Sequence, residues 1–314
     1  MRVYFVVNPT AGRGRANAVW KRIVALLQSH RENDVEWEAA LTDGPGAATR
    51  LAARAAERGY DRIVGVGGDG TLSEVLNGMA GSGAEIAAVP AGTGNDYCRS
   101  AGIPLDPMAA GRLALSGTAV PVDIGEMIPR SGRPRFFLNV AGIGFDAEVA
   151  RAVNRMPKRF GSTVPYVLGA LRTLAWYRPV PMALHVDGRT LERRVLLAAV
   201  GLGRYYAGGM MITPDAVLDD GVFDLCVAGD IGPMGVVRLL PGIYRGRHRS
   251  DPRVEFFRCR EIALESTRPL AIHAEGEVVG ELPARFRIHP SRLLLVREEG
   301  VAPGAGSARV PAAR

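Results

Sequence analysis

The sequence predicts a doubly wound α/β domain in the first part of the chain and a β-rich, antiparallel, sandwich-like domain in the second. A chain of 314 residues favours two domains over one. Strand and helix patterns alternate up to about residue 122, and short apolar runs separated by turn residues follow. We therefore place the domains at residues 1–122 and 123–298, with a last strand near 291–297 that either stays in the second domain or returns to the first. Residues 299–314 have no periodicity and are predicted to be a disordered tail.

In the first part, continuous apolar runs at residues 3–7, 63–66 and 86–89 are typical of strands in a parallel sheet covered on both faces. An alternating run at 35–41 predicts one more strand, and apolar residues at helical spacing predict helices near 19–27, 48–55 and 72–79. Polar, Gly-containing loops follow three of these strands. Because ligands bind at the carboxyl ends of the strands in such sheets, these loops are expected to form one site.

In the second part, turn residues separate most of the apolar runs, which indicates antiparallel strands. The expected strands are near residues 122–125, 136–140, 182–186, 195–200, 222–227, 262–264, 271–273, 286–288 and 293–296. The expected helices are near residues 147–156, 164–177 and 234–244.

The most informative stretch is the Gly-rich segment at residues 65–74, which lies between an expected strand and an expected helix. Glycines allow the backbone to approach a ligand closely, and the following helix N-terminus favours a phosphate. Asp69 would repel a phosphate unless a cation or a sugar hydroxyl lay between them, which points to a nucleotide with Mg²⁺. The alternative is a simple Gly-rich turn in which Asp69 caps the helix.

The composition narrows the class of partner. The net charge of +7 and the pI of about 9.7 indicate an anionic partner, such as nucleic acid, acidic phospholipid or a phosphorylated substrate. Aromatic residues are few and do not alternate with basic residues, which argues against nucleic acid. The three widely spaced cysteines fit a reducing compartment, and no apolar run approaches the roughly 20 residues that span a bilayer. The expected location is cytoplasmic, with peripheral membrane contact.

Four motifs in order resemble the diacylglycerol kinase catalytic-domain family, which includes soluble bacterial lipid kinases and is related to sphingosine and ceramide kinases. They are Asn8-Pro9-x-x-Gly12, Gly67-Gly68-Asp69-Gly70-Thr71 with Glu74, Gly92-Thr93-Gly94-Asn95-Asp96, and Glu275-Gly276-Glu277. The resemblance covers about residues 1–297. It implies an ATP- and Mg²⁺-dependent kinase that phosphorylates a lipid hydroxyl, with diacylglycerol as the expected acceptor and phosphatidic acid as the product.

The resemblance also implies roles for individual residues. Glu277 corresponds to the family's catalytic Glu, Asp69 is both catalytic and nucleotide-binding, and Asp96 and Asp123 correspond to acids near the catalytic Mg²⁺. The expected nucleotide-binding residues are Asn8, Pro9, Gly12, Thr42, Gly67, Gly68, Asp69, Gly70, Thr71, Leu72, Ser73, Glu74, Thr93 and Asn95. The chain departs from the family at Ser73, where Asn is usual, and at Glu275, where Asp is usual.

A loop before the expected strand at 222–227 resembles the family's structural Mg²⁺ site. By register, the ligands would be the Asp220 carboxylate and the Val217 and Val222 carbonyls. The alternative is an Asp-Gly turn without metal.

Several features have two interpretations. The basic stretch at residues 245–260 is either a solvated face or a surface for anionic lipid. Arg155, Lys158 and Arg159 could meet phosphate, and Trp176 and Tyr177 either pack in the core or line an acyl-chain groove. His273 lies in an apolar run and is expected to pack.

The expected partner is a lipid at the membrane surface rather than nucleic acid, and a homodimer is left open. One alternative function is an NAD kinase-like phosphotransferase with a soluble acceptor. Another is a catalytically silent sensor of nucleotide or lipid.

Overall fold

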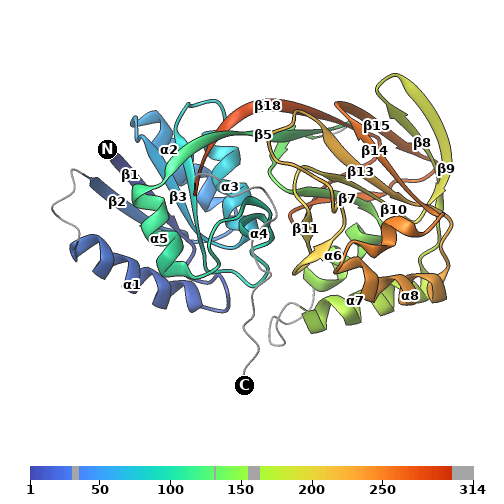
Figure 1. Ribbon diagram of the computed structural model, residues 1–314, viewed down its shortest axis with the longest axis horizontal. Helices are drawn as coiled ribbons and strands as arrows, with labels where there is room; N and C mark the ends of the chain where they lie inside the picture. The colour runs from blue at the N-terminus through green and yellow to red at the C-terminus, as the bar shows by residue number, and fades with distance from the viewer. Residues whose placement is uncertain (30–34, 131, 155–162, 299–314) are drawn as a thin grey trace.

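The computed structural model describes residues 1–29, 35–130, 132–154 and 163–298, which form two lobes (Figure 1). In the first lobe, parallel strands lie in the order β2-β1-β3-β4, the arrangement of a doubly wound sheet. The elements are β1 (Arg2–Val7), α1 (Arg15–Ser29), β2 (Glu36–Leu41), α2 (Ala47–Glu57), β3 (Arg62–Gly67), α3 (Asp69–Met79), β4 (Glu85–Pro90), α4 (Asp96–Ala101) and α5 (Pro107–Ser116).

Helices cover both faces of this sheet, and the central strands β1 and β3 are apolar after the arginine that begins each of them. The cluster that contains Phe5 and Ile23 packs α1 and α5 against one face. The α2 and α3 helices contact each other and pack against the opposite face, with Leu72 and Val75 buried.

In the second lobe, antiparallel strands that continue the sheet of the first lobe pack face to face against a six-stranded antiparallel sheet. Phe137 stacks on Phe223 at 5.8 Å between ring centroids and meets Phe286 edge-on at 6.4 Å, so these rings form part of the core of the second lobe. The first elements of the second lobe are β5 (Thr118–Pro129), β6 (Arg135–Phe137), β7 (Val140–Gly144), α6 (Phe145–Asn154), α7 (Thr163–Trp176), β8 (Val180–Val186), β9 (Arg189–Val195), β10 (Leu197–Gly201), β11 (Tyr205–Tyr206), β12 (Met210–Met211), β13 (Phe223–Ala228), α8 (Pro233–Ile243) and the 3₁₀ helix η1 (Arg247–Ser250). The remaining elements are β14 (Val254–Cys259), β15 (Glu261–Ser266), β16 (Ala271–Ala274), β17 (Glu277–Glu281) and β18 (Ala284–Arg297).

The long strands β5 and β18 arch between the lobes (Figure 1). Strand β18 pairs in parallel with β4 through Leu294 and Leu295, and its first half pairs with β15. One sheet therefore runs from β2 through β4 and β18 to β9. The second sheet has the order β14-β13-β10-β7-β16-β17.

The predicted fold class is confirmed, whereas several boundaries differ. The expected strands at 286–288 and 293–296 are one strand, β18, with a register shift between His289 and Leu293. The run at 136–140 is divided between β6 and β7. Sequence patterns missed β9 and β14, since exposed or half-exposed residues dominate both. Within the described residues, no helix combines the length and apolarity that crossing a membrane requires.

Candidate active site

Three loops meet where β1, β3 and β4 end, as the sheet topology requires. The Asn8 side chain donates from Nδ2 to Thr71 Oγ1 at 3.0 Å, which joins the first loop to the start of α3. Arg15 Nη2 lies 3.5 Å from the Gly92 carbonyl oxygen and connects the first loop to the loop after β4. Pro9 follows Asn8 in the first loop, and Thr42 follows β2, where its N–H donates to the Val7 carbonyl at 2.8 Å.

The glycines of these loops allow backbones to come unusually close. A Cβ built on Gly12, whose φ is +57°, would lie 2.2 Å from the Ala91 carbonyl oxygen. A Cβ on Gly92 would lie 2.4 Å from Gly68 Cα. Only glycine fits these two positions, and as a result bare backbone surrounds the N-terminus of α3.

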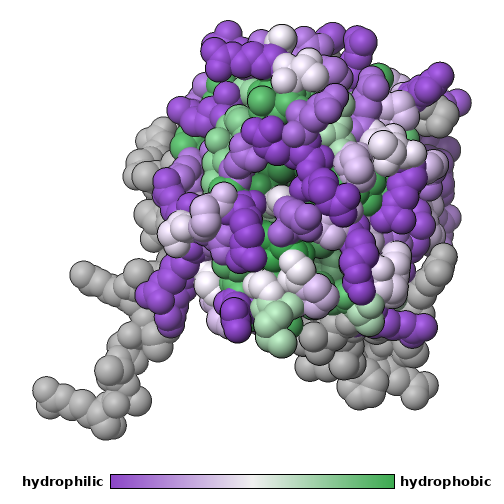
Figure 2. Space-filling view, turned by 90° about the vertical axis from the view of Figure 1, so that its right-hand side faces the viewer, coloured by the Kyte–Doolittle hydropathy of each residue, from purple (hydrophilic) through white to green (hydrophobic). Residues whose placement is uncertain are grey.

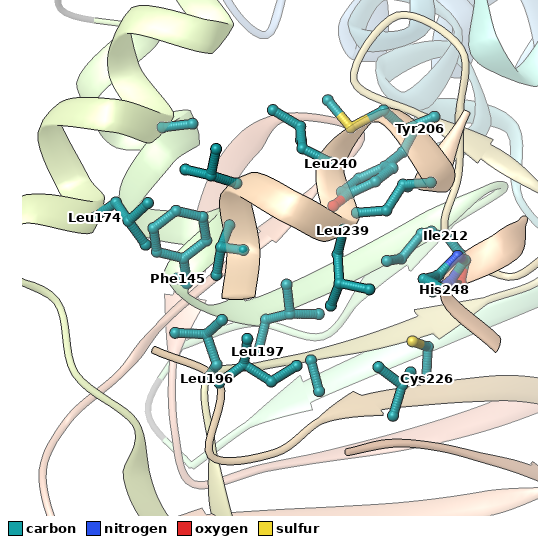
Figure 3. Close-up of a pocket in the computed structure, with 18 residues that line it drawn as sticks. Phe145, Leu174, Leu196, Leu197, Tyr206, Ile212, Cys226, Leu239, Leu240 and His248 are labelled. Atoms are coloured by element: carbon teal, nitrogen blue, oxygen red, sulfur yellow. Dashed lines mark hydrogen bonds between the residues drawn. The ribbon is translucent and has the colours of Figure 1, made fainter. Parts of the chain in front are cut away.

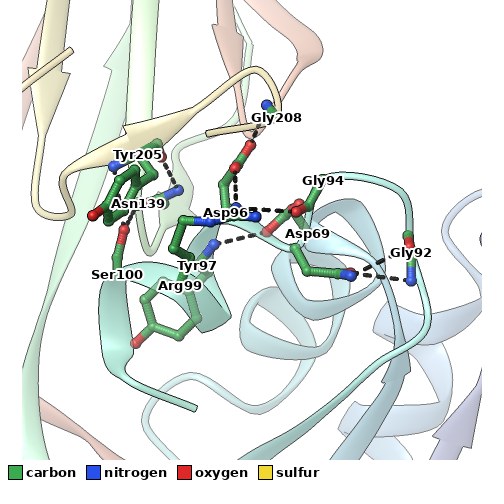
Figure 4. A network of polar contacts seen from close by, with 11 residues as sticks. Asp69, Gly92, Gly94, Asp96, Tyr97, Arg99, Ser100, Asn139, Tyr205 and Gly208 are labelled. Carbon is green, nitrogen blue, oxygen red and sulfur yellow. Dashed lines mark hydrogen bonds and ion pairs between the residues drawn. The ribbon is translucent and has the colours of Figure 1, made fainter. Parts of the chain in front are cut away.

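Asp69 and Asp96 face one another across Gly94 (Figure 4). A Cβ built on Gly94 would lie 3.1 Å from Asp69 Oδ2 and 3.2 Å from Asp96 Oδ2. Tyr97 N–H donates to Asp69 Oδ1 at 2.9 Å, which fixes one carboxylate on the start of α4.

Asp96 is held from both lobes. Its Oδ1 accepts from Arg99 Nη1 at 2.8 Å, and its Oδ2 accepts from Gly208 N–H, between β11 and β12, at 2.7 Å. Burial and then the negative charge of Asp69 raise the pKa of Asp96 to about 6. The pair is therefore a partly desolvated anionic site whose ionised form a cation would stabilise.

This donor set fits Mg²⁺, which is commonly bound by one or two carboxylates together with water and phosphate oxygens. Among residues 1–29, 35–130, 132–154 and 163–298, no group of three His, Cys, Asp or Glu side chains could hold a metal. Phosphate oxygens would have to complete the coordination, as they do in many phosphotransferases.

Glu277 reaches this site from the β16–β17 hairpin of the second lobe. Its Oε1 lies 2.9 Å from the position of a Cβ built on Gly70, so the carboxylate is next to the first turn of α3. Arg135 Nη2 donates to the other oxygen of Glu277 at 3.2 Å. A carboxylate from about two hundred residues downstream is thus brought beside the Gly-rich turn.

The residues of both lobes enclose a cleft of about 360 Å³. Its lining comprises Asp69, Gly70, Thr93, Gly94, Asp96, Asn139, Val140, Asp146, Ala150, Val153, Tyr206, Ala207, Gly208, His273, Glu275, Gly276 and Glu277. The cleft is polar next to α3 and α4 and includes apolar side chains from α6, an arrangement that suits a ligand with a polar and an apolar part.

Four residues of the two Gly-containing motifs are buried or bond to neighbouring protein groups. The Glu74 carboxylate accepts from Gly46 N–H at 2.9 Å and Ala48 N–H at 3.0 Å, so it caps the N-terminus of α2 rather than facing a ligand. Ser73 and Leu72 are buried, and Leu72 belongs to the core beneath α3. Asn95, with φ of +53°, uses its amide group to bond both the N–H and the carbonyl of Gly92. These four residues shape the loops, and their expected role in nucleotide binding stays a prediction.

Asp123 is placed with a different loop from the one expected. Its Oδ2 accepts from Gly221 N–H at 2.7 Å and its Oδ1 from Ser291 N–H at 2.8 Å, and it is not among the residues that line the cleft. Strand β5 carries the Asp123 side chain toward the 215–222 loop, and its expected role at the catalytic Mg²⁺ stays a prediction.

At the expected structural Mg²⁺ site, Arg258 would compete with a cation for the Asp220 carboxylate. Asp220 Oδ1 accepts from Val222 N–H at 3.2 Å, and its Oδ2 pairs with the Arg258 guanidinium. A cation held by Asp220 and the Val217 and Val222 carbonyls would have to share that carboxylate with Arg258. The structural Mg²⁺ remains a prediction.

Sequence reasoning did not find several of the lining residues. Asn139, Asp146, Tyr206 and Gly208 belong to none of the motifs, and His273 was expected only to pack. Their proximity depends on pairing between distant strands, which leaves no local signal. Arg155, Lys158 and Arg159 lie outside the described residues.

The comparisons with known proteins agree with this architecture. The diacylglycerol kinase catalytic domain model matches residues 2–127, and the YegS C-terminal NAD kinase beta sandwich-like domain model matches residues 139–297. A diacylglycerol kinase of Mycobacterium tuberculosis is 33% identical over 94% of this chain and 95% of its own length. A diacylglycerol kinase of Bacillus subtilis is 30% identical over 91% and 92%, respectively.

A solved structure extends the likeness to three dimensions. The crystal structure of a putative diacylglycerol kinase from Bacillus anthracis aligns with a TM-score of 0.77 at 25% identity, over 96% of this chain and 98% of that one. Sequence and structure agree along nearly the whole length, and the chain therefore belongs to the diacylglycerol kinase catalytic-domain family of lipid kinases.

Proposed function

We propose that the protein transfers the γ-phosphate of ATP to a lipid hydroxyl in the presence of Mg²⁺, with diacylglycerol as the acceptor and phosphatidic acid as the product. The observation that carries the proposal is the position of Glu277 beside Gly70 and Asp69, across the cleft from the second lobe. The names of the relatives support the acceptor.

The first lobe is suited to hold the nucleotide. The turn after β3 and the N-terminus of α3 present N–H groups and a partial positive charge of about half an elementary charge to a phosphate. Asp69 and Asp96 would hold Mg²⁺, which when bound neutralises the charge that develops on the phosphate oxygens. The loop glycines keep side chains away from the polyphosphate.

The second lobe supplies the group that handles the proton. The acceptor hydroxyl oxygen forms a bond to the γ-phosphorus while the bond between that phosphorus and the bridging oxygen of ADP breaks. The Glu277 carboxylate takes the hydroxyl proton. Arg135 holds the other oxygen of Glu277, which fixes the direction of the carboxylate.

An apolar cavity supports a lipid as the acceptor. It has a volume of about 70 Å³ and lies between α7, α8 and the sheet strands β10 and β13 (Figure 3). Tyr206 lines both this cavity and the cleft. An acyl chain in this cavity would therefore lie next to the cleft.

The test is a kinase assay with Mg²⁺ and ATP against a panel of diacylglycerol, phosphatidylglycerol, a long-chain base, a polyprenol and NAD, with mass detection of the products. We expect transfer to diacylglycerol, lost in Asp69→Ala and Glu277→Ala while the fold is kept. Glu281→Ala is the matched control, since Glu281 lies on the same hairpin and also faces an arginine, Arg151, at 3.6 Å.

Three results would contradict the proposal in whole or in part. Phosphorylation of NAD without any lipid would identify the NAD kinase-like alternative. Tight ATP binding without turnover on any acceptor would identify a silent sensor. Full activity of Glu277→Ala would remove Glu277 as the base.

A further inference from the structure

A buried Asp–His pair lies behind the candidate base, outside every motif of the sequence. Asp146, in the first turn of α6, and His273, on β16, are 1% and 3% exposed. His273 Nε2 lies 3.3 Å from Asp146 Oδ2. Both side chains line the cleft, yet neither has a role in the proposed reaction.

The neighbouring strand leaves room for this pair. On β7, Gly142 lies opposite His273. A Cβ built on Gly142 would lie 2.1 Å from Asp146 Oδ2 and 2.3 Å from His273 Nε2. The pair therefore fills a space that exists only because residue 142 is glycine.

The hydrogen bonds define which ring nitrogen of His273 carries the proton. Gly276 N–H donates to His273 Nδ1 at 3.3 Å, so Nδ1 is an acceptor. The ring proton must then be on Nε2, where it faces the Asp146 carboxylate. In such an arrangement the carboxylate sets the tautomer of the imidazole. The Tyr206 ring stacks on the imidazole at 6.4 Å with an interplanar angle of 10°, which restrains its tilt.

The turn that His273 contacts has a strained backbone. Glu275 and Gly276 form the two-residue loop of the β16–β17 hairpin, with φ angles of +48° and +83°. A left-handed conformation is unfavourable at a residue other than glycine, so contacts outside the turn must maintain it. Glu275 Oε1 accepts from Leu138 and Asn139 N–H groups, both at 3.0 Å, and His273 holds Gly276.

Glu277 follows this turn directly. We propose that Asp146 and His273 are positioning residues: the Asp146 carboxylate keeps His273 Nδ1 free to accept from Gly276 N–H, which holds the Glu275-Gly276 turn in the conformation that places Glu277 beside Gly70. This inference rests on the proposed function of Glu277. A displacement of about 1 Å in a group that acts on the substrate can cost about a hundredfold in rate, so the turn needs a fixed support.

Two substitutions of His273 separate its two hydrogen bonds. In His273→Asn, the amide oxygen replaces Nδ1 as the acceptor for Gly276 N–H. In His273→Gln, the amide nitrogen replaces Nε2–H toward Asp146, and the acceptor for Gly276 is lost. We expect kcat with diacylglycerol to fall by about tenfold or more in His273→Gln and to stay within about threefold in His273→Asn, with the KM for ATP unchanged in both.

Asp146 provides a second, independent pair of variants. This pair tests the positioning role of Asp146 and His273 if a His273 variant does not fold. Asp146→Asn keeps an oxygen that can accept from Nε2–H, whereas Asp146→Ala does not and leaves the tautomer undefined. We expect kcat to fall in Asp146→Ala and to be largely retained in Asp146→Asn. Melting temperatures identify variants that lose the fold.

The matched control is the pair His289–Glu126, at 2.9 Å, which lies on β18 and β5 and does not line the cleft. His289→Gln and His289→Asn should leave kcat unchanged. A His273→Gln enzyme as active as wild type would overturn the inference, and so would equal losses of kcat in His273→Gln and His273→Asn. A rise in the KM for ATP by the same factor as the fall in kcat would also overturn it. A wild-type protein without lipid kinase activity would overturn the proposed function as well, so the two failures can be distinguished.

Discussion

At the scale of single residues, burial changes the acid–base behaviour of the carboxyl groups around the cleft. Glu275 is the clearest case, since desolvation raises its pKa to about 7 although the Asn139 and Leu138 N–H groups and Ser73 lower it. The charge of Asp69 raises it further. Glu275 has one methylene more than the Asp that is usual in the family. Its longer side chain reaches the N–H groups of Leu138 and Asn139.

Replacement of Glu275 by Gln should flatten the pH dependence of stability. The folded-state pKa is raised, so the native protein binds this proton more tightly than the unfolded chain does. Wild-type stability should therefore fall as the pH rises from about 4.5 through about 7. Gln does not titrate and can still accept from both N–H groups.

Urea denaturation of wild type and Glu275→Gln at pH 5 and pH 8 measures the effect. The difference in the free energy of unfolding should shift in favour of the variant at pH 8, on the order of 1–3 kcal/mol. A difference that is the same at both pH values would show that Glu275 does not titrate in this range.

At the scale of elements, the α2–α3 contact explains why one motif residue faces away from the cleft. Glu74 lies one turn into α3 and accepts from two N–H groups at the start of α2. Thr49 Oγ1 donates to the Glu74 carbonyl at 3.0 Å, which adds a second link between these helices. One residue of the Gly-rich motif therefore caps a neighbouring helix.

Glu74→Ala should destabilise the protein rather than weaken nucleotide binding directly. Loss of a helix cap costs about 0.5–2 kcal/mol. Denaturation should detect this loss, and calorimetric titration at low temperature should give an ATP affinity within about threefold of wild type, since a capping residue has no contact to lose. An unchanged stability with a large loss of ATP affinity would restore the nucleotide-binding role. Asp106→Ala is the control, because Asp106 caps α5 through Ala109 N–H at 2.8 Å.

The cavity beneath α8 gives a prediction for helix α7. Ala170 lines the cavity, whereas Ala175 on the same helix is exposed. Ala170→Leu should fill the space and lower kcat/KM for long-chain diacylglycerol more than for a short-chain analogue, while Ala175→Leu leaves both unchanged. A cavity that takes no acyl chain would give equal activities in all three proteins.

At the scale of the whole molecule, β18 makes the two lobes part of one sheet. Leu295 is fully buried, pairs with Ile86 on β4 and with Val120 on β5, and carries the connection between the lobes. The cleft lies between lobes that share this strand, so loss of packing at β18 affects both walls of the site.

Leu295→Ala should lower the stability of both lobes together. Truncation of a buried leucine costs about 2–5 kcal/mol. Differential scanning calorimetry should show one transition, moved to lower temperature, for the variant. Leu294→Ala is the control, since Leu294 is 37% exposed on the same strand. Two separate transitions would mean that the lobes unfold independently.

The sequence by itself determined what depends on neighbours along the chain. The Gly-rich turn between β3 and α3, the parallel character of the first lobe and the antiparallel character of the second follow from apolar periodicity and from glycines at turns. The motifs in order were sufficient to indicate the family, because they combine several local signals.

Only the tertiary structure decided what depends on distant pairing. It placed Glu277 beside Gly70, moved Asp123 to the 215–222 loop, and joined Asp146 to His273. Each of these contacts joins segments that are dozens of residues or more apart. The physical reason is that periodicity reports which face of an element is buried, whereas strand register and the packing of the lobes decide which side chains meet there.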